Sequence, residues 1–377
     1  MSTGEDGMTA THENRISFFS GGAAFATLSE VVDAAREALA PEVRDFLDGG
    51  AGRELTLRRN RSAFDRWAYR PRVMTGLTTP DLTTTFLGIP LGLPVLTSPF
   101  GADGLFHPDG HCAVARANAA EGVVSIVPEA GTHGIEAVAA AGPAAARIAQ
   151  LHPMGPPANF AAMLRRIEDA GYDAVCVTVD CPTAGWRERN LHNRFDPDPS
   201  VITGNYPAGG AVSPEEVFGQ LFTRTERIWT WAELGERMAG TALPWMAKGV
   251  LTGDSADAAI SAGASAVLVS NHGGRQLDGA PAALDQLPEV AEAVRGRAQI
   301  ALDSGIRSGS DIVTALALGA DAVVVGRLPA YGLAAGGEAG VRRVHQLLRE
   351  EMCTVLTLLG ANAVSELGPW ALQRVEP

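Results

Sequence analysis

A histidine and an arginine stand directly after a strongly apolar run in the second half of the chain. His272 and Arg275 belong to residues 270–276, whose sequence is SNHGGRQ, and the apolar run covers residues 266–269. A histidine exchanges a proton near neutral pH, and the planar guanidinium of an arginine binds a carboxylate through two hydrogen bonds. The two glycines between them allow a tight turn and a close approach of the backbone to a ligand. The segment therefore indicates a general base beside a carboxylate-binding residue, at the end of a buried strand.

A single lysine marks a second position of the same kind. Lys248 is the only lysine among the 30 Lys and Arg residues, and it ends the apolar run of residues 243–247. Drift in composition would leave a lone lysine more readily on an exposed helix than at the end of a buried strand. We therefore predict that Lys248 has a function in the site.

The composition excludes several classes of protein. With 377 residues, of which 46% are hydrophobic and 19% charged, the chain can bury a large core, as one domain with a modest extension or as two domains. The formal net charge of -13 disfavours nucleic acid and anionic membranes as partners. No long apolar stretch and no basic-then-apolar leader is present, so we expect neither a membrane span nor a secretory signal. The four cysteines form no CxxC pair, which is typical of a reduced cytoplasmic protein.

The elements that must position these residues can be predicted from the apolar pattern. Residues 1–25 mix Gly, Ser, Thr and Ala without a sustained period, and we expect them to be disordered. Residues 28–47 have the apolar period of a helical region, which ends at the break formed by Gly49 and Gly50. We expect residues 26–377 to form a single domain that includes this helical segment.

From about residue 90 the chain alternates short apolar runs with alanine-rich amphipathic segments. The runs cover residues 94–99, 123–126, 146–151, 174–179, 245–248, 266–270, 299–302 and 322–325. Strands and helices in this alternation and number predict an α/β fold, the closed (β/α)8 TIM barrel. A doubly wound open sheet is the rival fold, but no GxGxxG opens a helix after the first strand. The longest interruption, residues 196–227, is rich in Pro and Gly and predicts a mobile loop over the barrel mouth after the fourth strand.

The last residues of the predicted strands carry the chemistry, since the carboxyl ends of barrel strands converge on one face. These residues are Gln150, Thr178, Asp180, Lys248, Ser270, His272, Asp303, Gly326 and Arg327. Glycines stand beside arginines after the last two strands, in residues 303–309 and 326–327. Exposed backbone N–H groups and a guanidinium both favour a dianion, so this pattern indicates a phosphate site.

These strand-end residues resemble those of the FMN-dependent α-hydroxy acid oxidase and dehydrogenase family, which includes glycolate oxidase, lactate oxidase and mandelate dehydrogenase. The resemblance covers about residues 28–365, and the segment 270–276 is its most specific part. It implies that His272 is the catalytic base, that Asp180 pairs with its imidazolium, and that Arg187 and Arg275 bind the substrate carboxylate. It implies an FMN cofactor, with Lys248 at the flavin N1 and O2 edge. The other implied cofactor-binding residues are Gly101, Gln150, Thr178, Ser270, Asp303, Gly305, Arg307, Gly326 and Arg327.

The chain departs from the family pattern on the substrate side. Two tyrosines are replaced, by Phe46 and His152, a serine by Pro128, and a bulky aromatic residue by Ala130. Fewer hydroxyls and a smaller wall predict a wider pocket that suits a bulky or aromatic 2-hydroxy acid better than glycolate or lactate. His152 could equally be a polar residue of the rim with no part in binding.

Other readings stay open at this point. The missing tyrosines also suit an FMN-dependent oxidase for an amine, an alcohol or another intermediate of a specialised pathway. A non-redox FMN barrel or an inactive binding protein is a third reading, but such a site would not need His272 together with both arginines. We expect a homo-oligomer, with a tetramer as an option from the resemblance. No metal is expected, because His107 and His111 have no evident third ligand, and His192, His345, Trp229 and Trp231 are expected to be surface or packing residues.

Overall fold

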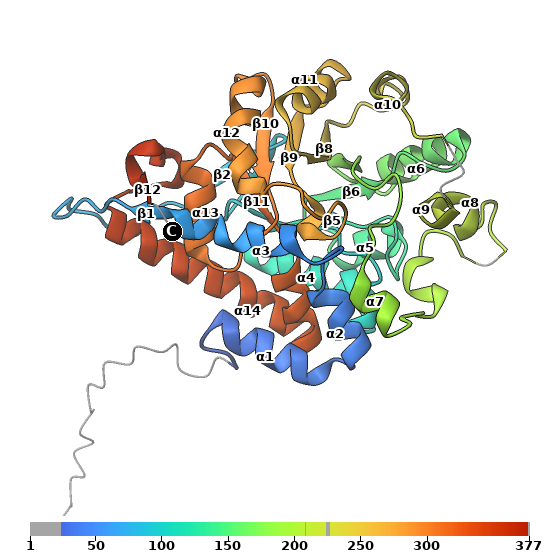
Figure 1. Cartoon of the computed structure of the whole chain (residues 1–377), viewed down its shortest axis with the longest axis horizontal. Coiled ribbons are helices and arrows are strands. Elements are labelled where there is room, and N and C mark those ends of the chain that lie inside the picture. Colours follow the sequence, from blue (N-terminus) through green and yellow to red (C-terminus); the bar gives the residue numbers. More distant parts are fainter. Residues whose placement is uncertain (1–23, 208, 224–226, 376–377) are drawn as a thin grey trace, which may run out of the picture.

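The protein is built around a closed barrel of eight parallel strands (Figure 1). The computed structural model describes residues 24–207, 209–223 and 227–375. Neighbouring strands follow the order β10-β11-β4-β5-β6-β7-β8-β9. Their bounds are β4 (Val95–Thr97), β5 (Val124–Val127), β6 (Arg147–Leu151), β7 (Ala174–Thr178), β8 (Trp245–Val250), β9 (Ala266–Val269), β10 (Gln299–Leu302) and β11 (Ala322–Val325). Every predicted run forms one of these strands, so the predicted TIM barrel is confirmed.

The strands are mostly apolar because both of their faces are buried. One face fills the barrel interior, where Leu96, Ile126, Ile148 and Met246 are at most 1% exposed. The other face packs against the surrounding helices. Most polar residues of the barrel strands therefore stand at or next to the strand ends.

A hairpin that the sequence did not reveal closes the amino-terminal end of the barrel. It consists of β2 (Thr84–Phe86) and β3 (Ile89–Leu91), and its Phe86 is fully buried among the interior side chains. Gln299, the first residue of β10, fixes the hairpin because its side chain donates to the Thr85 carbonyl and accepts from the Leu87 amide. With this end closed, a ligand can enter only at the opposite mouth.

Helices cover the outside of the barrel. They are α4 (Gly110–Glu121), α5 (Ile135–Ala141), α6 (Pro157–Asp169), α10 (Trp231–Met238), α11 (Gly253–Ser261), α12 (Ala283–Val294), α13 (Gly309–Ala317) and α14 (Arg327–Leu359). The last of these is irregular at Gly336 and Gly337, where the backbone leaves the helical region. It packs against both α4 and the amino-terminal helix α1 (Figure 1).

The predicted amino-terminal helical region forms two helices rather than one continuous one. Helix α1 (Leu28–Ala38) begins with the Thr27 hydroxyl accepting from the Glu30 amide at 3.2 Å, a typical N-cap. Helix α2 (Pro41–Asp48) starts anew at Pro41, which lacks the N–H that a continuous helix would need there, and ends at Gly49 as predicted. A third helix, α3 (Leu55–Ser62), follows, and β1 (Trp67–Tyr69) pairs with the carboxyl-terminal strand β12 (Leu372–Arg374).

We predicted that residues 1–25 are disordered. Residues 1–23 lie outside the described residues, and only Ala24 and Phe25 lie within them. Phe25 is held in place, because its carbonyl accepts from Arg343 Nε at 2.7 Å and its ring packs against the core. Within the described residues, no helix is both long and apolar enough to cross a membrane.

The segment predicted as a loop after β7, residues 196–227, contains three short helices in its described part. They are η3 (Pro199–Ile202), α8 (Pro214–Phe218) and α9 (Gln220–Thr223), and α7 (Glu188–His192) precedes the segment. Tyr206, Val217 and Phe218 are buried, so this part of the segment packs onto the barrel. The mobility of the segment stays a prediction.

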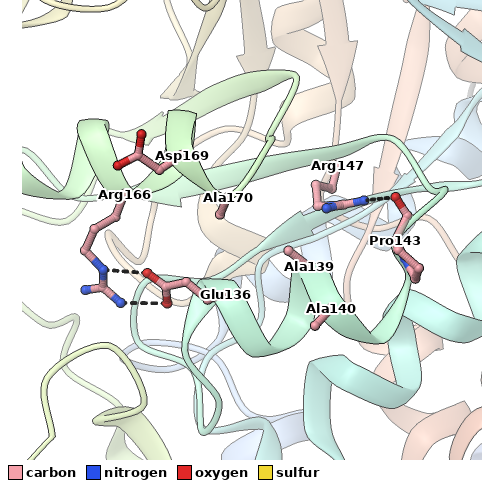
Figure 2. Close-up of a pocket in the computed structure, with 8 residues that line it drawn as sticks. All are labelled: Glu136, Ala139, Ala140, Pro143, Arg147, Arg166, Asp169 and Ala170. Carbon is pink, nitrogen blue, oxygen red and sulfur yellow. Dashed lines mark hydrogen bonds and ion pairs between the residues drawn. The ribbon is translucent and has the colours of Figure 1, made fainter.

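A surface hollow of about 540 Å³ lies on the flank of the barrel, between α5 and α6 (Figure 2). Its two arginines already have partners: Arg166 binds the Glu136 carboxylate, and Arg147 donates to backbone carbonyls. Arg147 is the first residue of β6, so the hollow lies toward the closed end of the barrel. The predicted site residues lie at the other end.

Candidate active site

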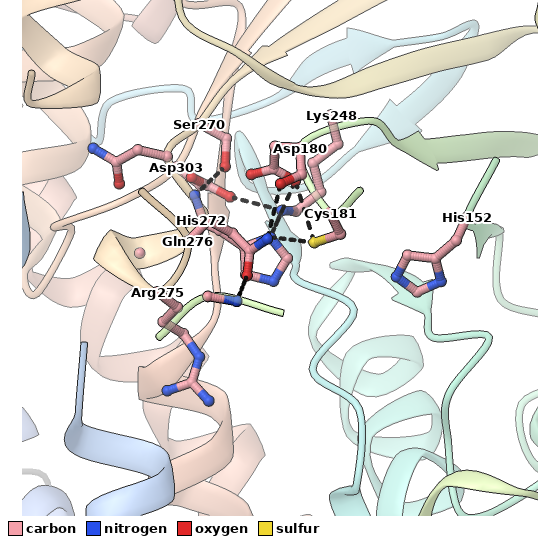
Figure 3. Close-up of polar contacts among 12 residues, drawn as sticks. His152, Asp180, Cys181, Lys248, Ser270, His272, Arg275, Gln276 and Asp303 are labelled. Atoms are coloured by element: carbon pink, nitrogen blue, oxygen red, sulfur yellow. Dashed lines mark hydrogen bonds and ion pairs between the residues drawn. The ribbon is translucent and has the colours of Figure 1, made fainter. Parts of the chain in front are cut away.

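The carboxyl ends of β7, β8, β9 and β10 bring the predicted chemical groups together (Figure 3). His272 Nδ1 lies 3.2 Å from Asp180 Oδ1 and 3.4 Å from Lys248 Nζ. Lys248 Nζ is 3.9 Å from Asp303 Oδ2. Four residues that are far apart in the sequence thus form one cluster of alternating charge around an imidazole.

The turn after β9 presents His272 in an unusual backbone conformation. His272, Gly273 and Gly274 have φ angles of 58°, 65° and 76°. At Gly274 a Cβ atom would lie 2.7 Å from the Leu57 amide nitrogen, so only glycine fits there. A left-handed conformation is unfavourable for a histidine by about 1–3 kcal/mol, and strain of this kind is typical of functional sites.

The surroundings of His272 keep its imidazole neutral. Burial, and then the ammonium of Lys248, lower the pKa of His272 to about 4, although Asp180 acts in the opposite direction. Asp180 stays ionised: burial would raise its pKa, but its interactions with His272 and with the ammonium of Lys248 lower that pKa to about 2. A neutral imidazole with an anion behind it is the state that a general base requires at neutral pH.

Lys248 keeps its charge in a buried position. Its side chain is only 3% exposed, and burial alone would lower the pKa of the ammonium. The carboxylates of Asp180 and Asp303 outweigh burial and raise that pKa. The only lysine of the chain is therefore a fixed cation at the barrel mouth.

Four arginines meet at the same mouth without an acidic partner. Within the described part of the chain, Arg187, Arg275, Arg307 and Arg327 form no ion pair with a carboxylate. Burial lowers the pKa of each, and their mutual repulsion lowers those of Arg275 and Arg327 further. Several cations in one partly buried place favour the binding of anions, even though the whole chain has a net charge of -13.

The carboxyl end of helix α2 orients two of these arginines. Arg275 Nη1 donates to the carbonyls of Phe46 at 2.6 Å and Gly49 at 3.0 Å. Arg327 donates to the carbonyls of Leu47 and Gly49, both at 2.9 Å. The last carbonyls of a helix carry partial negative charge and lack partners within the helix. The amino-terminal extension therefore positions the cations of the barrel mouth, a function that the sequence did not indicate.

The remaining predicted cofactor-binding residues lie where the strands end. Gln150, Thr178, Ser270 and Asp303 are buried, with Ser270 Oγ accepting from the His272 amide at 3.0 Å. For two of the predicted glycines, the packing of the protein itself explains why no larger residue fits. A Cβ atom at Gly101 would lie 2.7 Å from the Ala130 carbonyl oxygen, and one at Gly305 would lie 2.4 Å from that of Asn60. At Gly326 a Cβ atom would lie 3.4 Å from the Ser98 side chain, which is a tight but tolerable contact.

The three predicted substrate-side residues lie in different surroundings. Phe46 stacks on Phe195 at 5.1 Å, and Arg275 Cζ lies 4.9 Å above its ring. His152 contacts the carboxylate of Glu129, with Nδ1 at 2.9 Å from Oε2. Ala130 is partly buried against the core.

The sequence analysis missed two residues beside the predicted ones. Glu129 is 2% exposed, and its only signal was an acidic residue at the end of an apolar run. Cys181 Sγ lies 3.5 Å from His272 Nδ1. The one feature of the sequence that could have indicated it is its position directly after Asp180. With Asp180 and His272, Cys181 forms a set of three possible metal ligands, but the ammonium of Lys248 beside His272 opposes a further cation.

The other histidines and the tryptophans have structural surroundings. The sequence showed no carboxylate near His111, but the structure places the buried Asp103 3.1 Å from its Nδ1. His345 is buried, with Nε2 2.8 Å from Asn118 Oδ1, whereas His192 is exposed. Trp229 packs edge-on against Phe160 at 5.2 Å, as expected of a packing residue. The absence of a metal stays a prediction.

Comparisons with known proteins agree with this geometry. Residues 35–374 match the model of the family of FMN-dependent dehydrogenases. An L-lactate oxidase of Nostoc sp. is 39% identical over 90% of this chain and 96% of its own length. Glycolate oxidase of Spinacia oleracea is 37% identical over 88% of this chain and 91% of its own length.

Solved structures agree as well. A mandelate oxidase in complex with (S)-2-phenylpropionate is 35% identical, with a TM-score of 0.84 over 93% of this chain and 98% of that one. A mandelate oxidase with benzoyl-formic acid is 36% identical, again with a TM-score of 0.84. The chain therefore belongs to the family of FMN-dependent α-hydroxy acid oxidases and dehydrogenases, enzymes that oxidise 2-hydroxy acids with FMN as cofactor.

Proposed function

We propose that this enzyme oxidises a 2-hydroxy acid with a bulky or aromatic substituent to the 2-oxo acid, with His272 as the base. In this proposal Arg187 and Arg275 bind the substrate carboxylate. The observation that carries it is the neutral imidazole of His272 at the same barrel mouth as arginines without acidic partners. A base and a carboxylate site in one place suit proton removal from a hydroxy acid.

The residues at the mouth fit FMN. Within the described residues, Arg307 and Arg327 form no ion pair, and burial outweighs the attraction of Asp48 for both, so a terminal phosphate dianion would stabilise their charges. Lys248 would place its ammonium at the flavin ring, where a cation stabilises negative charge on reduction. Bound FMN supplies the acceptor for the two electrons of the oxidation, which no side chain can provide. The other residues that would hold it are Gly101, Gln150, Thr178, Ser270, Asp303, Gly305 and Gly326.

The geometry of His272 indicates which atom takes the proton. Within the described residues, its ring contacts to Asp180, Cys181 and Lys248 are all made by Nδ1, which leaves Nε2 for the substrate. The oxidation removes two electrons and two protons from the substrate. Nε2 takes one of these protons, so the ring becomes an imidazolium, and the other hydrogen would leave with the electron pair to bound FMN. The ionised Asp180 then stabilises this cation, as the carboxylate does in other acid-base pairs.

Aromatic side chains support the choice of a bulky substrate. The ring of Phe46 stacks with Phe195 at 5.1 Å and with Phe106 at 6.4 Å, and the guanidinium of Arg275 lies 4.9 Å from it. An apolar substituent placed here would gain roughly 25 cal/mol per Å² of buried surface. At Ala130 only a methyl group occupies the position of the wall.

Filling the space at Ala130 should therefore discriminate between substrates. We expect Ala130→Trp to lower kcat/KM for mandelate by roughly tenfold or more, because overpacking costs about 1–3 kcal/mol, and to lower that for glycolate much less. Steady-state kinetics with both acids measures this, and Ala130→Ser is the matched control of nearly unchanged size. An equal loss for both acids would mean that Ala130 does not border the substituent.

The phosphate site can be tested separately. We expect Arg327→Met to raise the dissociation constant of FMN by roughly ten- to a hundredfold, because a hydrogen bond to a charged group contributes about 1.5–3 kcal/mol, and to change the KM of the acid less. Fluorescence titration of the apoprotein with FMN measures the first quantity. Since Arg327 also holds three backbone carbonyls, Arg307→Met is the second variant, with a single backbone contact at 3.5 Å. If both variants retained FMN normally, the phosphate would have to bind elsewhere.

The rival substrate classes are separated by a simple experiment. The holoenzyme is mixed without oxygen with panels of 2-hydroxy acids, the alcohols that lack the carboxylate, and amines, and the loss of flavin absorbance is followed. We expect only the acids to reduce the flavin efficiently, because Arg187 and Arg275 require a carboxylate. Faster reduction by an alcohol or an amine would favour the atypical oxidase instead.

We also propose that the enzyme is a cytoplasmic homo-oligomer, with a tetramer as one option. Support for the location comes from Cys112, Cys176, Cys181 and Cys353, all of which are unpaired. Support for assembly comes from apolar side chains on one surface, where Met74 is 99% and Leu358 68% exposed and the Arg72 amide donates to the Leu359 carbonyl. Light scattering on the purified enzyme gives the number of subunits directly.

A further inference from the structure

We propose that His152, held by the buried carboxylate of Glu129, determines substrate specificity by accepting a hydrogen bond through Nε2. The substrate group that it selects is an O–H or N–H donor on the substituent of the 2-hydroxy acid. This inference rests on the proposed function and names a feature of the substrate that the proposed function leaves open.

Three donors converge on the Glu129 carboxylate. Oε2 accepts from the His152 amide at 2.8 Å and from His152 Nδ1 at 2.9 Å, and Oε1 accepts from the Tyr206 hydroxyl at 2.6 Å. Burial, and then Glu129 itself, raise the pKa of Tyr206, so its O–H remains a donor. A carboxylate has no hydrogen to donate, so Glu129 accepts in all three of these contacts.

An acceptor-only partner fixes the tautomer of His152. Because Nδ1 donates to Glu129, the proposal places the acceptor lone pair of the ring on Nε2. The amide nitrogen of Gln150 lies 3.2 Å from Nδ1 and 3.3 Å from Nε2 of His152. Because it is almost equally far from both ring nitrogens, it is poorly aligned with the lone pair of Nε2. Its orientation is set by the Glu129 amide, which donates to Gln150 Oε1 at 3.2 Å. Nε2 is thus the acceptor that the ring can offer to a ligand.

The position of the ring suits contact with the substituent rather than with the reacting carbon. His152 follows the last residue of β6, at the same barrel mouth as His272, and Figure 3 shows its ring across the mouth from His272 and Arg275. The side chain is 12% exposed and stands edge-on to Phe218 at 6.0 Å. The ring is packed on one side and held by Glu129 through Nδ1, and its Nε2, with the Gln150 amide at 3.3 Å, is the nitrogen proposed to bind the substituent.

Glu129 also ties this element to the long segment after β7. Besides the Tyr206 hydroxyl, its backbone carbonyl accepts from Asn205 Nδ2 at 2.8 Å. Tyr206→Phe therefore removes a contact to the segment while leaving the contact between Glu129 and His152. This variant is the matched control for Glu129→Gln, in which an amide that can donate replaces the carboxylate beside Nδ1 and no longer fixes the tautomer.

The experiment compares pairs of acids that differ by one hydroxyl group. The pairs are mandelate and 4-hydroxymandelate, phenyllactate and 4-hydroxyphenyllactate, and lactate and 2,3-dihydroxypropanoate. For the holoenzyme we expect kcat/KM to favour the hydroxylated member of at least one pair by roughly three- to tenfold, the range of one hydrogen bond. Dissociation constants of the corresponding 2-oxo acids, from flavin absorbance changes of the oxidised enzyme, should differ by a similar factor. They provide a readout that does not depend on turnover.

The variants decide between recognition and a merely structural role. His152→Phe and Glu129→Gln should bring the ratio of kcat/KM for the hydroxylated acid to that for its partner close to one. Tyr206→Phe should leave this ratio unchanged. A structural defect would lower both members of a pair equally and leave their ratio unchanged. The inference is overturned if the holoenzyme prefers no hydroxylated acid, or if the preference survives in His152→Phe or in Glu129→Gln. If no 2-hydroxy acid of any pair reduced the flavin, the proposed function itself would fail instead.

Discussion

Replacing His272 by alanine is expected to lower the rate constant of anaerobic flavin reduction by roughly 10²- to 10⁴-fold, the usual contribution of a general base. The imidazole is the only neutral base among the charged groups that surround it, with Nδ1 3.2 Å from Asp180 Oδ1 and 3.4 Å from Lys248 Nζ. FMN should be retained, because the proposed phosphate contacts are made by other residues. Stopped-flow absorbance at saturating mandelate measures the rate constant, and an unchanged value would mean that another group is the base.

The pH dependence of the unchanged enzyme tests the same assignment. The pKa of His272 is lowered to about 4, so the ring is neutral above that pH and protonated below it. A base must be unprotonated to act, and kcat/KM should therefore fall only as the pH drops through about 4. This acidic limb should be absent from the residual activity of His272→Ala.

Replacing Lys248 by methionine is expected to have the second largest effect. Flavin reduction should slow by roughly 10²- to 10³-fold, the usual loss when a group that stabilises developing negative charge is removed. FMN should also bind more weakly. The measurements are single-turnover reduction and titration of the apoprotein with FMN.

A control is needed because Lys248 also neutralises buried acids. Its ammonium is the cation beside Asp180 and Asp303. Methionine would leave both buried carboxylates without this cation, which is destabilising. Thermal unfolding of the variant therefore accompanies the kinetics. Full reduction rates in a folded Lys248→Met protein would show that no cation is needed at the flavin.

The barrel could be predicted because each of its strands is buried on both faces. Such strands appear in the sequence as continuous apolar runs, and Ala322–Val325 is a clear example. The charged and polar residues that follow the runs then had to share one mouth, which is why the meeting of Asp180, Lys248 and His272 could be expected.

Contacts that depend on tertiary packing could not be predicted. The hairpin around Phe86 overlaps residues 86–96, where Gly and Pro interrupt the apolar residues and hide the strand pattern. Its partner Gln299 is an ordinary strand residue in the sequence. The carbonyls of Phe46 and Gly49 that orient Arg275 belong to the backbone, which every residue has. The three donors to Glu129 come from His152 and Tyr206, which are distant in the sequence, and nothing next to Glu129 indicates these contacts.

The relative rates with mandelate and glycolate test the central claim most directly. The holoenzyme is mixed anaerobically with increasing concentrations of mandelate, glycolate or benzyl alcohol, and the second-order constant of flavin reduction is obtained for each. We predict a higher constant for mandelate than for glycolate, because the substituent can pack near Phe46, and a far lower constant for benzyl alcohol, which has no carboxylate for Arg187 and Arg275. A higher constant for glycolate than for mandelate, or for benzyl alcohol than for either acid, would contradict the proposal.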